Sequence, residues 1–404
     1  MRSRSGPGVA AGPPGRRGTL ASRLGSTPTG AASRRRLEAS RIARRSARGE
    51  ARGPVKSQFE IGGRRVGLGE PCYVIAEAGV NHNCDLALGR RLVEGAHAAG
   101  ADAIKFQNYE ASRIATRTAP RYWLDEKDPD GTQWDTFDQL DKLSERDFAG
   151  LLEHATSRDL TAFSTPFDEQ AVELLARLGV PAFKIASADL TCHPLLACAA
   201  RVGRPMILST GTATLAEVEE ALAICRGAGN DRVVLLHCTL KYPCPPEAVN
   251  LRMMQHLMRA FPDVPVGLSD HSIGISVPQA AVALGACVVE KHYTVDKTLP
   301  GSPDHHLSVD PSELRAMIEG IRTIEKAMGR AQKGLDPVER EAFLYARRSV
   351  TSAVAIPKGT RISREMLTWK RPGTGISPRF FEMVIGRTAS TDIPGDTTLT
   401  WEML

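Results

Sequence analysis

Two lysines stand where buried strands are expected to end, and each would need a negative charge beside it. Lys105 lies in the segment Ile-Lys-Phe-Gln, and Lys184 lies in Phe-Lys-Ile-Ala-Ser. Burying an ammonium group is costly unless it meets a counter-charge. Hydroxyl groups end or follow similar apolar segments at Thr165, Ser187 and Ser209. These residue types predict a binding site for a ligand with several negative charges, such as a phosphate together with a carboxylate.

The segment Ser-Thr-Gly-Thr that begins at Ser209 adds a second source of anion binding, because it is expected to open a helix with free backbone N–H groups. The alternative is that each lysine pairs with an acid of the protein, such as Glu77 or Asp189. We favour the anion site because the same residue types recur on separate segments.

Two histidines indicate a metal site. His271 follows Gly-Leu-Ser-Asp at the end of one apolar segment, and His292 ends the next one, Val-Val-Glu-Lys-His. Two imidazoles that leave positions for water and substrate oxygens suit a divalent transition ion. Such an ion would act as a Lewis acid on a carbonyl group. The alternative is that each histidine is only hydrogen-bonded.

Other polar residues have more than one interpretation. Glu77, in Ala-Glu-Ala-Gly-Val-Asn-His-Asn, could act as an acid–base group or anchor sugar hydroxyls, and it could also pair with Lys105. Tyr242 is expected to form a wall of the pocket. The neighbours His305 and His306 are predicted to be exposed loop residues rather than metal ligands.

Eight short apolar segments would position these residues. Apolar runs of four to eight residues are typical of buried parallel strands, and amphipathic helical stretches separate these eight. The pattern predicts an α/β fold, a (β/α)₈ or TIM barrel, whose chemistry lies at the carboxyl ends of its strands. The segments are residues 72–77, 103–107, 161–165, 182–187, 206–210, 233–238, 265–271 and 288–292. The polar residues expected to meet at that end are Glu77, Lys105, Gln107, Thr165, Lys184, Ser187, Ser209, His237, Ser269, His271 and His292.

The barrel is expected to occupy residues 57–330, beginning with a small hairpin at 59–69. A long connection with several aromatic residues, 108–158, predicts a lid or a substrate wall, or else a loop that only covers the barrel. A linker is expected at residues 331–348.

A small β-rich domain is predicted at residues 349–404. It contains an internal repeat, because residues 356–367 match residues 393–404. Each copy is expected to form a turn and a strand, followed by an N-cap at Ser363 or Thr400.

Charge and composition exclude several classes of protein. Residues 1–56 hold thirteen Arg and one Lys against two Glu, a charge of +12, whereas the whole chain carries only +6. This tail has too little apolar surface to form a core and is predicted to be disordered. A nucleic-acid-binding arm is the less favoured interpretation of this tail, so nucleic acid is not an expected partner. The remainder of the chain is mildly acidic and has no run of the roughly 18 apolar residues that a membrane span needs. The eight cysteines show no metal-binding spacing, which favours a reducing, cytoplasmic location.

A series of motifs, in order along the chain, resembles the sialic acid synthase (N-acetylneuraminate synthase) family. The motifs are Ala-Glu-Ala-Gly-Val-Asn-His-Asn, Lys-Phe-Gln, Ser-Thr-Pro-Phe-Asp, Phe-Lys-Ile-Ala-Ser, Leu-Ser-Thr-Gly, Leu-His-Cys, Tyr-Pro, Gly-Leu-Ser-Asp-His and Glu-Lys-His. The later segment Lys-Arg-Pro-Gly-Thr-Gly-Ile-Ser, which begins at Lys370, resembles the SAF (antifreeze-like, β-clip) domain of that family. The resemblance covers residues 58–404.

The resemblance implies a transferase that condenses phosphoenolpyruvate with N-acetylmannosamine or a related N-acyl sugar, giving a nonulosonic acid and phosphate. It implies a divalent metal, manganese before magnesium or cobalt, and a homodimer with swapped SAF domains. The implied catalytic residues are Glu77, Lys105, Lys184 and His292, and the implied metal ligands are His271 and His292. The implied substrate-binding residues are Gln107, Thr165, Ser187, Ser209, Tyr242, Ser269, Asp304 and Arg371, the last reaching into the partner's barrel.

Two departures from the family pattern leave the sugar open. Leu240 and Lys241 precede Tyr242 where small or polar residues are usual, and the segment Gly-Ser-Pro-Asp ending at Asp304 carries one extra residue. Two rival functions are also considered. One is an aldolase that forms a Schiff base on Lys184 or Lys105, and the other is a carbohydrate-binding protein without catalysis.

Overall fold

The structure is a computed structural model that describes residues 57–123 and 130–404. The tail predicted to be disordered, residues 1–56, lies outside the described residues. The chain divides into two compact units, Met1–Ala327 and Met328–Leu404. Among the described helices, none combines the length and the apolar character that a membrane crossing requires.

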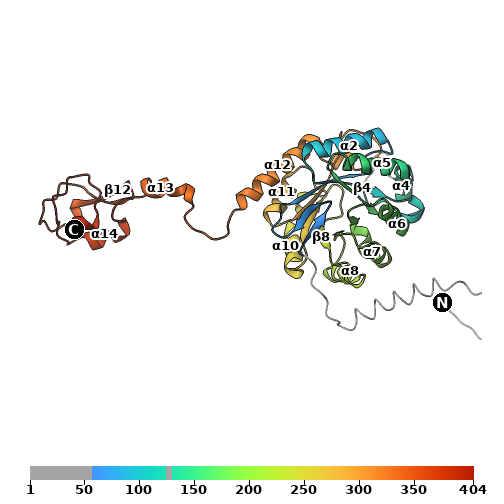
Figure 1. The fold of residues 1–404 in the computed structure, drawn as a ribbon. Helices are drawn as coiled ribbons and strands as arrows, with labels where there is room; N and C mark the ends of the chain where they lie inside the picture. Colours follow the sequence, from blue (N-terminus) through green and yellow to red (C-terminus); the bar gives the residue numbers. More distant parts are fainter. Residues whose placement is uncertain (1–56, 124–129) are drawn as a thin grey trace, which may run out of the picture. The chain divides into compact units, whose positions relative to one another are not determined.

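A closed barrel of eight parallel strands forms the first unit (Figure 1). The strands are β3 (Tyr73–Gly79), β4 (Ala103–Asn108), β5 (Thr161–Pro166), β6 (Phe183–Ile185), β7 (Met206–Ser209), β8 (Val233–Cys238), β9 (Val266–Asp270) and β10 (Val288–His292). β10 pairs with β3 and closes the ring, with His292 opposite Glu77. The predicted barrel is confirmed, and each strand overlaps its predicted segment.

Helices surround the barrel (Figure 1). They include α2 (Leu86–Ala99), α5 (Glu145–Thr156), α6 (Glu169–Arg177), α7 (His193–Arg201), α8 (Leu215–Gly227), α10 (Leu251–Ala260), α11 (Ser276–Ala283) and α12 (Pro311–Met328). Helix α2 begins where the Asp85 carboxylate accepts hydrogen bonds from the backbone of Ala87 and Leu88, and it ends at Gly100, which has a φ of 86°. Helices between successive strands agree with the predicted alternation of strands and helical stretches.

The hairpin of β1 (Gln58–Ile61) and β2 (Arg64–Gly67) is joined to the barrel through one buried carboxylate. Asp102 precedes β4, so it lies at the amino-terminal end of the strands. Its Oδ2 accepts hydrogen bonds from the Val74 backbone at 2.7 Å and from Arg322 Nη2 at 3.2 Å. Its Oδ1 pairs with Arg64. The hairpin, β3 and α12 are therefore linked by Asp102.

The second unit has its own core, which includes Val350, Ile362 and Val384. Strands β11 (Ser349–Ser352) and β12 (Leu367–Lys370) are antiparallel. The two copies of the repeat meet through a bridge between Ile356 and Ile393. Each copy ends in a short 3₁₀ helix, Arg364–Met366 or Trp401–Met403, which begins after Ser363 or Thr400 without a side-chain cap.

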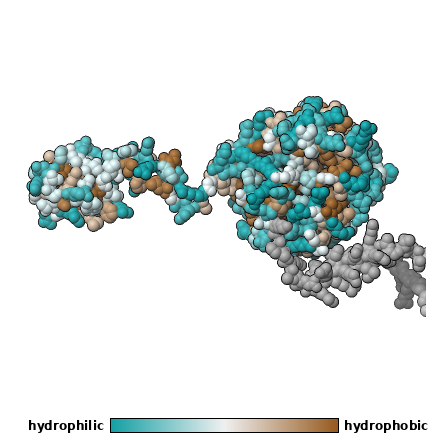
Figure 2. Space-filling view, viewed as in Figure 1, coloured by the Kyte–Doolittle hydropathy of each residue, from teal (hydrophilic) through white to brown (hydrophobic). Residues whose placement is uncertain are grey.

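A short helix, α13 (Arg340–Tyr345), lies in the segment predicted to be a linker. Apolar side chains are exposed on this helix and just before it (Figure 2). Val338 is 85% exposed and Tyr345 is 62% exposed. Exposed apolar residues that cluster in this way are typical of a surface that another molecule covers.

Replacing Asp102 by Asn should destabilise the barrel. The change removes the charge of a buried carboxylate that Arg64 and Arg322 face, and we expect a loss of about 1–3 kcal/mol in the free energy of unfolding. Urea denaturation of the full chain measures it. Asp263→Asn, at an exposed site, is the control and should change little. Equal stabilities of the two variants would contradict the role of Asp102.

Candidate active site

A large cavity opens at the carboxyl ends of the barrel strands. It encloses about 1030 Å³, counting the space that is open to solvent at its mouth. Twelve of the fourteen residues predicted for the site line it: Glu77, Lys105, Gln107, Thr165, Lys184, Ser187, Ser209, Tyr242, Ser269, His271, His292 and Asp304. The other two are His237 and Arg371, and Arg371 is exposed on the second unit.

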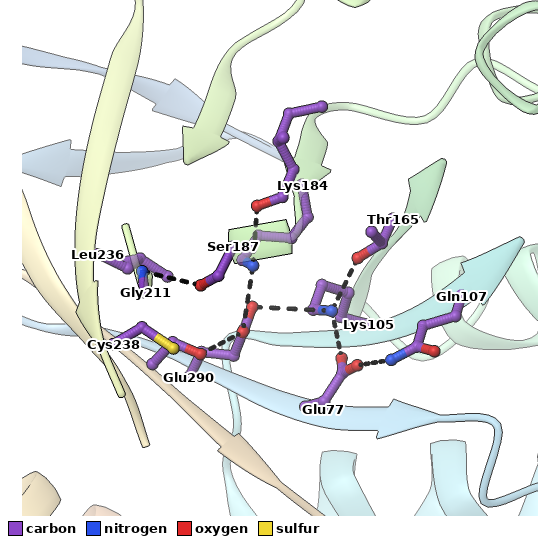
Figure 3. Close-up of polar contacts among 12 residues, drawn as sticks. Glu77, Lys105, Gln107, Thr165, Lys184, Ser187, Gly211, Leu236, Cys238 and Glu290 are labelled. Atoms are coloured by element: carbon purple, nitrogen blue, oxygen red, sulfur yellow. Dashed lines mark hydrogen bonds and ion pairs between the residues drawn. The ribbon is translucent and has the colours of Figure 1, made fainter. Parts of the chain in front are cut away.

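A buried network of opposite charges forms the floor of the cavity (Figure 3). Lys105 Nζ lies 2.7 Å from Glu77 Oε2 and donates a hydrogen bond to Thr165 Oγ1 at 2.9 Å. Glu290 lies between the two lysines, 3.8 Å from Lys105 and 3.5 Å from Lys184. Both lysines therefore pair with acids of the protein, and they also face the cavity.

Glu290 is a site residue that the sequence analysis missed. Its Oε1 accepts a hydrogen bond from Ser269 Oγ at 2.8 Å. Its spacing from His292 could have identified it in the sequence, because Glu290 precedes His292 by two residues on the same strand. Side chains at i and i+2 of a strand lie on the same face. A histidine that faces the cavity therefore requires Glu290 to face it as well.

The charge balance of this network favours binding of an anion. Burial raises the pKa of Glu77 to about 7, although Lys105 opposes the shift. Burial would also raise the pKa of Glu290, but Lys105 and Lys184 outweigh it and hold that pKa below its ordinary value. Burial lowers the pKa of Lys184. When Glu77 is protonated, two ammonium groups face a single carboxylate, which favours an anionic ligand.

The hydroxyl groups border the lysines. Ser187 Oγ accepts a hydrogen bond from the Gly211 backbone at 3.0 Å (Figure 3), and a Cβ at Gly211 would lie only 2.8 Å from that oxygen. Ser209 Oγ is buried and has no hydrogen-bond partner among the described residues. The prediction that the segment from Ser209 opens a helix was wrong, because α8 begins at Leu215, after its N-cap Thr214.

The two predicted metal ligands are neighbours, with ring centroids 5.2 Å apart. His271 Nδ1 donates a hydrogen bond to the Thr239 carbonyl at 2.9 Å, which leaves Nε2 as the atom with a lone pair. Burial lowers the pKa of His292 well below its ordinary value, which favours the neutral imidazole. His292 Nδ1 is buried without a hydrogen-bond partner among the described residues and lies 3.6 Å from Asp304 Oδ2.

This donor set fits a divalent transition ion. Neutral imidazoles are the form that binds metal, and His292 holds an orphaned nitrogen. In the described part of the chain, no group of three or more His, Cys, Asp or Glu side chains is arranged to hold a metal ion. The protein would therefore supply the two imidazoles, and oxygen atoms of water and substrate would complete the coordination.

An ion pair on the outer side of the same strands supports the histidines. Lys291 Nζ lies 2.6 Å from Asp270 Oδ2, and both side chains are buried. Asp270 precedes His271 and Lys291 precedes His292, so the pair joins β9 to β10 directly beside the imidazoles.

Two histidines differ from the predictions. His237 does not line the cavity, because its Nε2 donates a hydrogen bond to the Val249 carbonyl at 2.7 Å on the other face of β8. His305, predicted to be exposed, is only 2% exposed. Its Nε2 donates to Asn83 Oδ1 at 3.2 Å, and its Nδ1 lies 2.8 Å from Thr294 Oγ1.

Aromatic side chains line the cavity beside the imidazoles. This aromatic wall comprises Tyr109, Tyr122, Trp123, Phe137, Phe167 and Tyr242. Four of the six come from the long connection between β4 and β5, which includes the helices α3 (Ala111–Ile114) and α4 (Gln133–Leu140). Of the two predictions for this connection, the structure supports a substrate wall.

A parallel barrel with buried lysines, carboxylates and imidazoles at its strand ends defines an enzyme of the TIM-barrel class that handles a small anionic substrate. Comparison with known families makes this specific. The model of the NeuB family matches residues 92–333, and that of the SAF domain matches residues 347–404. The chain belongs to the NeuB family, so the resemblance found in the motifs is confirmed.

Relatives and solved structures agree with this assignment. The chain is 42% identical over 337 residues to N,N'-diacetyllegionaminic acid synthase of Legionella pneumophila, covering 82% of this chain and 94% of that one. It is 35% identical to human N-acetylneuraminate-9-phosphate synthase, and the match covers 85% of this chain and 95% of that one. Among solved structures, the fold is similar to that of the sialic acid synthetase of Leptospira borgpetersenii in complex with citrate, with a TM-score of 0.62 and 35% identity. The match covers 71% of this chain and 95% of that one.

The burial of His305 predicts a loss of stability in mild acid. Burial lowers the pKa of His305 to about 4, whereas an imidazole in an unfolded chain titrates near about 6.5. At pH values between these two pKa values, the imidazole is protonated in the unfolded chain but neutral in the folded protein. The free energy of unfolding should therefore fall as the pH falls from about 6.5 towards 4. In His305→Gln this fall should be shallower, as measured by urea denaturation at several pH values. The exposed neighbour provides the control, since His306→Gln should keep the slope of the parent protein, and an unchanged slope in His305→Gln would refute the explanation.

Proposed function

We propose that the protein is a sialic-acid-type synthase that condenses phosphoenolpyruvate with an N-acyl amino sugar, N-acetylmannosamine or a related one, and releases phosphate. The observation that carries this proposal is the presence of two buried lysines and two adjacent imidazoles on one cavity. Membership of the NeuB family and similarity to its N,N'-diacetyllegionaminic acid and N-acetylneuraminate-9-phosphate synthases support the same chemistry.

The lysines would bind phosphoenolpyruvate. Lys105 and Lys184 would neutralise its phosphate and carboxylate, and the hydroxyls of Ser187 and Ser209 would donate hydrogen bonds to them. The unpartnered Ser209 Oγ is available for this contact. Binding an anion next to Glu290 would favour the protonated form of Glu77, so its proton would be held at the site.

The other side of the cavity would bind the sugar in its open-chain form. Gln107, Tyr242 and Asp304 would contact it, with the aldehyde group next to His271 and His292. These two histidines would hold manganese, with magnesium or cobalt as alternatives. The ion, when bound, supplies Lewis-acid polarisation of a carbonyl oxygen.

The reaction then balances as follows. The methylene carbon of phosphoenolpyruvate forms a carbon–carbon bond to the aldehyde carbon, whose oxygen takes up a proton. Water adds to the former enol carbon and loses a proton, and phosphate leaves with its bridging oxygen. The protein contributes position and electrostatic stabilisation. Glu77, held by Lys105 and by Gln107 Nε2 at 3.0 Å, has a pKa suited to proton transfer near neutrality.

A Schiff-base aldolase remains the second candidate, because burial lowers the pKa of Lys184 and so favours the nucleophilic free amine. Against it, Glu290 lies 3.5 Å from Lys184 and stabilises the charged form. Treatment with borohydride in the presence of pyruvate traps a Schiff base, so a covalent pyruvate adduct on Lys184 would favour the aldolase.

The main test of the proposed function is phosphate release from phosphoenolpyruvate with a panel of N-acyl sugars, with and without manganese. We expect release only when a sugar and the metal are both present. Lys184→Met should lower kcat/KM about a hundredfold or more, because a cation aimed at developing negative charge is lost. Lys142→Met, on an exposed lysine, should keep full activity. Absence of phosphate release with every sugar would refute the proposal.

We further propose a homodimer in which Arg371 of each copy enters the barrel of the other. Arg371 is exposed on the second unit, and the exposed apolar residues around α13, such as Val338 and Tyr345, would be covered by a second copy. A cytoplasmic location is proposed as well. The buried thiols Cys225 and Cys287 fit a reducing compartment because they form no disulfide.

Co-expression of two inactive variants tests the exchange of Arg371. In a mixed dimer of Arg371→Ala and Lys184→Met, one of the two sites would combine a wild-type barrel with a wild-type Arg371. The mixture should therefore regain about a quarter of the parent activity, since half of the dimers are mixed and half of their sites are intact. Each variant alone sets the baseline. If the mixture stays at that baseline, Arg371 does not act across subunits.

A further inference from the structure

Two loops at the carboxyl ends of neighbouring strands are joined by one asparagine. The first loop connects β3 to α2, and the second, residues 293–310, follows β10, which pairs with β3. Asn83 of the first loop donates a hydrogen bond from Nδ2 to the Pro300 carbonyl at 2.8 Å. Its Oδ1 accepts hydrogen bonds from the Ser302 backbone at 2.9 Å and from His305 Nε2 at 3.2 Å. One side chain thus holds the second loop through three hydrogen bonds, which we call the Asn83 clamp.

The backbone of both loops fits these contacts. Asn83 has a φ of 47°, a left-handed conformation that asparagine adopts more readily than most residues. Gly301 packs so closely against it that a Cβ there would lie 2.7 Å from Asn83 Oδ1. The other ring nitrogen of His305 also has a neighbour, since Nδ1 lies 2.8 Å from Thr294 Oγ1. Residues 300–305 therefore cannot move away from the first loop without losing several contacts at once.

The clamped segment brings Asp304 to the cavity. Asp304 lines the cavity, and its Oδ2 lies 3.6 Å from His292 Nδ1. Its backbone N–H donates a hydrogen bond to Ser302 Oγ at 3.3 Å, and its carbonyl accepts one from Ser308 Oγ at 2.7 Å. Asn81, in the same loop as Asn83, donates to Ser308 Oγ at 3.2 Å. The first loop therefore fixes the backbone of Asp304 from both directions along the chain.

We propose that Asn83 is a positioning residue for the acceptor sugar, because its clamp keeps Asp304 beside His292. The proposal rests on the proposed function, in which Asp304 contacts the sugar. It also accounts for a departure found in the sequence, where the segment ending at Asp304 carries one extra residue. Asn83 bonds to the chain on both sides of Gly301, so the additional length is held away from the carboxylate. Asn83 itself does not line the cavity and so acts only through this loop.

The test removes the clamp and measures the two substrates separately in the full-length enzyme. Glycine adopts a positive φ without strain, so Asn83→Gly removes only the side chain. The acceptor is N-acetylmannosamine or the N-acyl sugar that the parent enzyme turns over best. The variant should lower kcat/KM for this sugar about tenfold or more, through a higher KM. Calorimetry should give an unchanged affinity for phosphoenolpyruvate, because Lys105 and Lys184 lie on other strands, and this binding also shows that the variant is folded.

Cys84→Gly is the matched control. Cys84 is the next residue, has a similar φ of 59° and does not line the cavity, so its replacement should leave the kinetics of the parent enzyme unchanged. Asn83→Asp keeps an oxygen for the Ser302 and His305 donors but loses the donor to Pro300. Its loss in kcat/KM should be intermediate between those of the two glycine variants.

A double variant shows whether Asn83 acts through Asp304. In Asp304→Asn, the further change of Asn83 to Gly should cost no more than about twofold, because no carboxylate remains to be positioned. Single-turnover measurements with enzyme in excess make slow variants measurable. Losses that multiply, or an Asn83→Gly enzyme with the kinetics of Cys84→Gly, would overturn the role of Asn83 and leave the proposed function standing. Absence of phosphate release by the parent enzyme with every sugar would overturn both.

Discussion

The burial of two ammonium groups at the end of one barrel is the constraint on which the rest of the site depends. Lys105 and Lys184 come from different strands, and Glu290 from a third lies between them. Each charge is tolerable only because the others are present. The strands that carry them must therefore keep their register. The closed barrel supplies this register, since every strand is paired on both sides.

The same network provides two carboxylates that can act in different ways. Its carboxylates differ in environment, because Glu290 contacts both lysines whereas burial dominates at Glu77 and raises its pKa to about 7. Two carboxylates with different proton affinities can take separate roles, one as a fixed counter-charge and the other as a proton carrier. The aromatic wall adjoins the imidazoles, since the ring of Tyr242 lies 4.1 Å from that of His271, and it adds apolar surface to this charged cavity.

The sequence predicted the barrel well because buried parallel strands leave a clear pattern of apolar runs. It also predicted which residues meet at the strand ends, apart from three kinds of error. His237 was assigned to the wrong face because the boundary of a strand does not reveal which of its last two side chains points inward. Glu290 was missed because an acid inside an apolar strand has no obvious role until its lysine partners are known. The burial of His305 depends on Asn83, more than two hundred residues away in the chain, and no local pattern shows such a contact.

Strand β10 carries ion pairs on both of its faces. Glu290 points inward to the lysines of the cavity, and the next residue, Lys291, points outward to Asp270. A shift of the strand by one position would exchange the two faces. A shift in one direction would bring Lys291 next to Lys105 and Lys184, and a shift in the other direction would bring Glu290 next to Asp270, so either shift would oppose like charges. Strand β10, the last barrel strand in the sequence, thus carries a pattern of charges that disfavours misaligned pairing with its neighbours.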